Sequence, residues 1–132
     1  MKNRALLCAI AFLPALFVST LASSQEEQML KVATFNVSME ATNYKALGMK
    51  PSDQVLQHVL STGEHSQVKN IAEIIQRVNP DILMLNEFDY IADKRKGVEA
   101  FVKNYLNVSQ GGLDPVDYPY TYVATVNTGE PT

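Results

Sequence analysis

Polar residues follow two strand-like stretches of the chain, and their types suit metal binding. Asn36 lies near the end of LKVATFNV (residues 30–37), and Asn86, Glu87 and Asp89 follow the apolar run at residues 82–85. In open α/β sheets, ligands bind at the carboxyl ends of the strands. A carboxylate and an amide oxygen are hard ligands that suit Mg²⁺, Mn²⁺ or Ca²⁺. Asn36 and Glu87 are therefore candidate ligands of one ion, provided that the two strands are parallel neighbours.

The same residues also have a purely structural interpretation. Carboxylates are costly to bury unless they are paired or bind a metal. A strand that ends in acidic residues is, however, usually just reaching solvent, and Asn and Asp commonly form turns. Taken alone, the stretch NPDILMLNEFDY (residues 79–90) favours this interpretation over a metal site.

The elements that must position these residues alternate between strand and helix. Apolar spacing predicts helices at about residues 50–60, 68–78 and 98–106, with Ile71, Ile74 and Ile75 of the second buried against the sheet. Residues 38–48 are predicted to be loop, and the aromatic, β-branched residues 118–126 a third strand. The short link between residues 78 and 82 is typical of α/β units. The layout predicts an α/β fold with at least three strands.

Residues 1–24 have the organisation of a secretory signal peptide. Lys2 and Arg4 precede an apolar segment at residues 5–18, and small and polar residues follow. A membrane anchor is the alternative, but a span needs ~20 apolar residues and Pro14 interrupts this run. We expect cleavage after Ala22 or Ser24, a secreted or periplasmic product with no stable membrane span, and one domain over residues 25–132.

Composition narrows the chemistry of the predicted mature chain. Cys8, the only cysteine, lies in the leader, which excludes disulfides, cysteine metal sites and a cysteine nucleophile after cleavage. Two of the eleven basic residues lie in the leader and all fourteen acidic residues follow it, so residues 25–132 carry a net charge of −5. An acidic surface argues against broad, non-specific binding to nucleic acid or anionic membranes.

Three stretches resemble the N-terminal part of the endonuclease/exonuclease/phosphatase superfamily, the metal-dependent phosphoesterases that include pancreatic-type deoxyribonuclease. They are LKVATFNVS (residues 30–38), IAEIIQRVNPDIL (residues 71–83) and MLNEFDY (residues 84–90). YPYTYVATVNTGEP (residues 118–131) is similar to a secreted bacterial branch. The resemblance implies the N-terminal half of a four-layer αββα sandwich with mixed β-sheets.

The resemblance also implies roles for individual residues. Asn36 matches the asparagine that helps to hold the metal and the scissile phosphate, and Glu87 matches the main metal ligand. Asp89, together with Asn86 in place of the commoner glutamine, is expected to support the ligands without binding the ion. The implied cofactor is Mg²⁺, or Mn²⁺ or Ca²⁺. The implied substrate is a phosphate ester: nucleic acid, a phospholipid head group or a small phosphoester.

The superfamily's later motifs have no match in this chain. They supply a catalytic histidine, an Asp-x-Asn pair and a terminal Ser-Asp-His, whereas His58 and His65 precede the second motif and are not expected to act as bases. We therefore expect a truncated, inactive N-terminal part of a secreted phosphoesterase. The alternative is a non-catalytic secreted relative that binds a ligand or partner. Two other α/β classes fit less well. The chain lacks the Gly-x-x-x-x-Gly-Lys motif of phosphate-binding loops. It also lacks the Gly-x-Ser-x-Gly motif that presents a nucleophilic serine.

The leader predicts the start of the exported protein. N-terminal sequencing of the product recovered outside the cytoplasm is expected to begin at Ser23 or Gln25, because small residues precede both positions. An extracellular product that retains Met1 would contradict the prediction.

Overall fold

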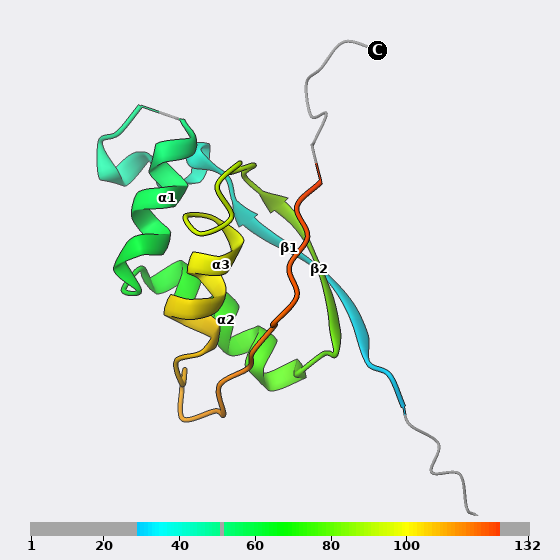
Figure 1. Cartoon of the computed structure of the whole chain (residues 1–132). Coiled ribbons are helices and arrows are strands. Elements are labelled where there is room, and N and C mark those ends of the chain that lie inside the picture. Colours follow the sequence, from blue (N-terminus) through cyan, green and yellow to red (C-terminus); the bar gives the residue numbers. More distant parts are fainter. Residues whose placement is uncertain (1–28, 51, 125–132) are drawn as a thin grey trace, which may run out of the picture.

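The computed structural model describes residues 29–50 and 52–124, so the predicted leader lies outside it. The elements run in the order β1 (Val32–Met39), 3₁₀ helix η1 (Ala41–Leu47), α1 (Asp53–Thr62), α2 (Ser66–Val78), β2 (Ile82–Phe88), α3 (Val98–Phe101) and π-helical turn η2 (Val102–Leu106) (Figure 1). This mixture of helices and strands is that of an α/β protein.

The two strands are parallel neighbours. Val32 lies opposite Ile82, and the register continues without a break to Asn36 opposite Asn86. Parallel strands need a long crossover connection, which η1, α1 and α2 supply here. Both strands were predicted near these positions, but β1 continues to Met39 and β2 to Phe88. The candidate residues Asn36, Asn86 and Glu87 thus lie within the strands.

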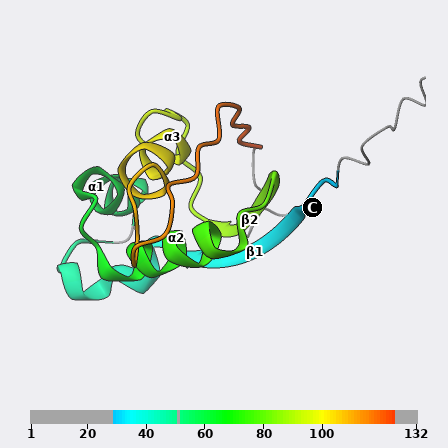
Figure 2. The ribbon, with the colours of Figure 1, turned by 90° about the horizontal axis from the view of Figure 1, so that it is seen from below.

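The helices pack against one face of this sheet. Side chains alternate along a strand, so Phe35, Leu83 and Leu85 pack against the helical core while the opposite face is open. On that open face Val32 is 64 %, Ile82 51 % and Met84 61 % exposed. Figure 2 shows α1, α2 and α3 on one side of the strands, with no described segment over the other.

Helix α2 packs between the sheet and the other helices. It begins at Ser66 and ends at Val78, close to the predicted 68–78, because Asn79 adopts a left-handed conformation and Pro80 follows. Ile71 and Ile75 are buried as predicted, but Ile74 is 47 % exposed, so its predicted burial was wrong. At 100° per residue, Ile74 lies outside the arc that carries the buried residues of α2.

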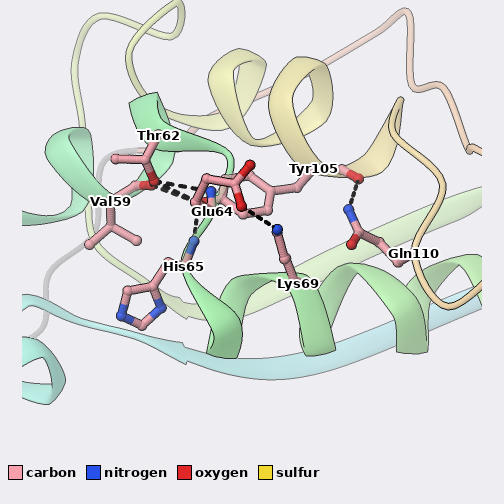
Figure 3. A network of polar contacts seen from close by, with 7 residues as sticks. All are labelled: Val59, Thr62, Glu64, His65, Lys69, Tyr105 and Gln110. Atoms are coloured by element: carbon pink, nitrogen blue, oxygen red, sulfur yellow. Dashed lines mark hydrogen bonds and ion pairs between the residues drawn. The ribbon is translucent and has the colours of Figure 1, made fainter.

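The phenol of Tyr105 joins three helical elements at the corner between α1 and α2 (Figure 3). Its O–H donates to the carbonyl of Val59 at 2.7 Å and accepts from the backbone N–H of His65 at 3.2 Å. The hydroxyl of Thr62 lies 3.3 Å from the same oxygen. The buried phenol therefore satisfies backbone groups at the end of α1 and at the start of α2, where helices leave them unpaired.

A buried glutamine ties α2 to the segment after η2. The Gln76 amide donates to the carbonyls of Leu106 and Val108 at 2.9 and 2.8 Å. Its oxygen accepts from the N–H of Gln110 at 2.9 Å. These bonds satisfy a polar side chain that is only 5 % exposed, and they anchor the turn-rich connection after the last helix.

The other helices differ from prediction in detail. The first begins at Asp53 and extends to Thr62, where Gly63 in the left-handed region ends it. The third is confirmed over residues 98–106, although its second half is π-helical. Part of the predicted loop at 38–48 forms η1, whose Tyr44 is buried.

None of the helices in the described ranges has both the length and the apolar character needed to cross a membrane.

The third predicted strand is wrong for residues 118–124, which pair with neither strand; residues 125 and 126 lie outside the described part. Pro119 has no N–H for a ladder, and side chains hold the segment instead. The Tyr118 hydroxyl donates to the carbonyl of Pro80 at 2.8 Å, and the Lys94 ammonium donates to that of Thr121 at 2.9 Å. The described sheet therefore has two strands.

The two isoleucines of α2 give a matched test of this packing. Ile75→Ala is expected to lower the free energy of unfolding by about 2–5 kcal/mol, because it leaves a cavity at a buried site. Ile74→Ala is expected to cost no more than about 1 kcal/mol. Urea denaturation of both variants measures the difference. Equal losses would contradict the orientation of α2.

Candidate functional site

The predicted ligands lie at one edge of the sheet. Asn36 and Asn86 are register partners at the carboxyl ends of β1 and β2, and Glu87 follows directly. All three side chains are exposed. The Asn86 amide donates to the hydroxyl of Thr34 at 2.9 Å, which links the two strands across the open face. Parallel pairing thus brings together residues that are far apart in the sequence.

A β-bulge interrupts the ladder at this edge. Asn36 pairs with Asn86 and Met39 with Phe88, so Val37 and Ser38 together face the single residue Glu87. Ser38 and Glu87 both have left-handed backbones, with φ of 51° and 54°. Non-glycine residues rarely adopt this conformation, and it costs roughly 1–2 kcal/mol. Two such residues face each other at the candidate site.

The bulge has a direct consequence for Glu87. Exposure alternates along β2 from Ile82 to Asn86, and regular alternation would turn the next residue toward the helical core. Glu87 is instead exposed, as Asn86 is, and Phe88 then packs against the core. Burying an unpaired carboxylate would be costly. The left-handed backbone therefore lets β2 carry a solvent-accessible glutamate between Asn86 and the core-facing Phe88.

Side chains hold the opposite half of the bulge in place. The backbone N–H of Ser38 donates to Oδ1 of Asn36 at 3.1 Å, which fixes the asparagine against its own strand. The carbonyl of Ser38 accepts from the amides of Asn43 at 2.9 Å and Gln67 at 3.1 Å. The asparagine oxygen has two lone pairs, so one remains for a ligand. Asn43 and Gln67 were not predicted, because nothing in their sequence context distinguishes them from other surface amides.

Asp89 connects the two strand exits. Its Oδ2 accepts from the backbone N–H of Ala41 at 2.6 Å, and its own N–H donates to the carbonyl of Met39 at 3.1 Å. These bonds hold the start of η1 against the end of β2. Because Oδ2 already accepts a backbone hydrogen bond, Asp89 is suited to holding the strand ends in place, which is the role expected for it.

Neither histidine lies on the two strands that carry the candidate residues. His65 packs edge-on against Tyr44, with ring centroids 5.0 Å apart, and its Nδ1 is buried without a hydrogen-bond partner in the described part of the chain. Burial, followed by the nearby Tyr105 and Asp89, raises the pKa of Tyr44 to about 12, so its phenol stays neutral near neutral pH. His58 is exposed on α1, outside the strand ends.

The donor set at this edge is small and open. Among the described residues, no three His, Cys, Asp or Glu side chains gather as a closed metal site. One exposed carboxylate and one amide oxygen are of the type that suits a hard divalent cation that keeps most of its waters. They do not fit Zn²⁺, which prefers nitrogen and sulfur ligands.

No family model, no curated protein and no solved structure matches the chain at a significant level. The superfamily resemblance therefore rests on the residues themselves, chiefly those at the ends of β1 and β2.

The left-handed backbone of Glu87 predicts an unusual ranking of variants. Glu87→Gly should be more stable than Glu87→Ala by about 1 kcal/mol, because glycine adopts positive φ without a steric penalty. At the neighbouring Asn86, whose backbone is not left-handed, the glycine variant should be less stable than the alanine variant by about 0.5–1 kcal/mol. Chemical denaturation of the four variants tests this. A lower stability of glycine at both positions would contradict the bulge.

Proposed function

We propose that this chain is part of a divalent-metal-dependent hydrolase of phosphate esters, a member of the endonuclease/exonuclease/phosphatase superfamily. The observation that carries the proposal is the edge where the register places Asn36 beside Asn86 and a bulge keeps Glu87 exposed. A surface turn could place acidic residues in solvent without two facing left-handed residues. Backbone strain of this kind clusters at functional sites.

Each residue at the edge has a proposed task. Glu87 would hold Mg²⁺, or Mn²⁺ or Ca²⁺, and the ion would offset negative charge on the phosphate oxygens. Asn36, whose oxygen is oriented by Ser38, would complete the ion's environment and contact the scissile phosphate. Asn86 and Asp89 would keep the strand ends in register. The resemblance assigns the activation of water to a histidine–aspartate pair, which nothing in this chain matches.

We also propose that the sheet belongs to a four-layer αββα sandwich. The open face carries Val32, Ile82 and Met84, each more than half exposed. A contiguous apolar face on a sheet is normally covered by a second layer. A second sheet would bury these residues and leave the polar strand ends at its rim.

The proposed substrates share a phosphate ester and differ in the group attached to it. Nucleic acid, phospholipid head groups and small phosphoesters all fit the chemistry of the edge. The net negative charge of the chain disfavours strong, sequence-independent binding to DNA, since such binding relies on many Lys and Arg contacts with phosphates.

The central variant is Glu87→Gln in the complete gene product. With Mg²⁺, hydrolysis of bis(p-nitrophenyl) phosphate or p-nitrophenyl phosphate should fall about a hundredfold or more, the effect of losing ~3 kcal/mol of charge stabilisation. The amide is nearly isosteric, so circular dichroism should be unchanged. Asp89→Asn should cost less, because the amide oxygen can still accept from Ala41.

Glu64→Gln is the matched control, because it removes an exposed carboxylate that pairs with Lys69 and that belongs to neither strand. It should leave hydrolysis unchanged. A Glu87→Gln variant with wild-type activity would reject Glu87 as the metal ligand. A wild-type protein that binds Mn²⁺ at this edge but hydrolyses neither ester would favour the non-catalytic alternative.

A further inference from the structure

A basic hollow lies between α1 and residues 95–104, which lead into α3 and continue through η2. It has a volume of about 460 Å³ and is widely open to solvent. Its charged lining consists of Arg95, Lys96 and Lys103, together with the imidazole of His58 from α1. No carboxylate is among its lining residues. We call this feature the basic hollow.

The charge of the basic hollow contrasts with that of the whole chain. The protein has a net charge of −3, so three clustered cations are a local feature rather than a general one. Among the described residues, ion pairs are formed by Lys69, Arg77 and Arg95, but not by Lys96 or Lys103. Like charges gathered in one place create a positive potential that concentrates anions, and here Asp93 and Glu99 reduce that potential only in part.

Arg95 is oriented by a neighbouring carboxylate. Its Nε and Nη2 donate to the two carboxylate oxygens of Asp93 at 3.0 and 3.1 Å, a bidentate geometry that fixes the guanidinium plane. This contact lowers the pKa of Asp93 and raises the pKa of Arg95. The nearby Glu99 raises the pKa of Arg95 further. Asp93 and Glu99 thus offset part of the charge of Arg95, and Asp93 also interacts with Lys96, so Lys103 contributes most of the remaining positive charge.

The walls of the basic hollow are held together across the gap between α1 and η2. The Asn104 amide donates to the carbonyl of Leu60 at 2.9 Å, and the Tyr105 hydroxyl donates to that of Val59 at 2.7 Å. The second bond belongs to the network in Figure 3. The space between the helices is therefore largely formed before any ligand binds, which lowers the entropic cost of binding.

We propose that the basic hollow binds a small anion that bears two or more phosphate groups. Its volume is that of a small-molecule site. Two lysines and an arginine from one side, with an imidazole from the other, can surround two phosphates. A long nucleic acid is a poorer fit, because it would extend over a surface that is acidic overall. The site is separate from the proposed metal edge and does not depend on that function.

Isothermal titration calorimetry of the complete gene product with pyrophosphate tests the proposal. EDTA in the buffer removes divalent ions, so the metal edge cannot contribute. The wild-type protein should show saturable, one-to-one binding. Lys96→Gln combined with Lys103→Gln should weaken it about tenfold or more, as expected for the loss of charge-assisted hydrogen bonds.

The matched control is Lys69→Gln combined with Arg77→Gln, which removes the same charge from α2 outside the hollow. It should change affinity by no more than about twofold, since only long-range attraction is lost. Lys103→Arg keeps the charge and should retain most binding, which guards against a folding defect in the double variant. Absence of saturable binding by the wild type, or equal weakening by both double variants, would overturn the proposal.

Discussion

The parallel pairing of β1 with β2 is the constraint on which the rest of the structure depends. Because parallel strands cannot be joined by a tight turn, the chain must cross back over the sheet, and α1 and α2 form that crossover. The helices therefore cover one face, and the polar residues after both strands meet at one edge. The buried contacts of Tyr105 and Gln76 stabilise the crossover by joining α1, α2 and the segment after η2. Without this pairing, Asn36 would not lie beside Asn86 and Glu87.

At that edge, the regular strand backbone that most residues prefer would not leave the Glu87 carboxylate in solvent. The bulge exposes it by placing Ser38 and Glu87 in left-handed conformations. A regular strand would turn Glu87 toward the helical core. The left-handed conformations of Ser38 and Glu87 avoid this, and the amides of Asn43 and Gln67 hold the strained segment through the carbonyl of Ser38. Proteins tend to depart from locally favourable conformations where function requires it. The proposed phosphoesterase role gives such a reason for retaining a glutamate at a position that glycine would occupy more easily.

Periodic patterns were sufficient to predict the principal elements. The apolar spacing of α2 and the apolar run of β2 both indicated their elements, and the short link between them indicated an α/β unit. The burial of Ile74 was predicted wrongly, because helical spacing alone does not separate an apolar residue beside the buried arc of a helix from one within that arc. Tyr118–Ala124 has strand-forming residues but no ladder, since pairing depends on neighbours that composition does not reveal. The bulge could not be predicted, because neither Ser38 nor Glu87 is a residue type that favours positive φ. The basic hollow combines residues from α1 and from the chain after β2, which no local pattern connects.

The location of a bound divalent ion tests the central claim most directly. Mn²⁺ broadens NMR signals steeply with distance, and it reports weak binding in fast exchange, as expected for an open site with one carboxylate. Titration of the ¹⁵N-labelled protein with substoichiometric Mn²⁺ should broaden the amides of Asn36, Asn86 and Glu87 first, and Glu87→Gln should remove this selectivity. Broadening centred on other acidic residues, such as Asp114 and Asp117, or unchanged by Glu87→Gln, would contradict a metal site at the ends of β1 and β2.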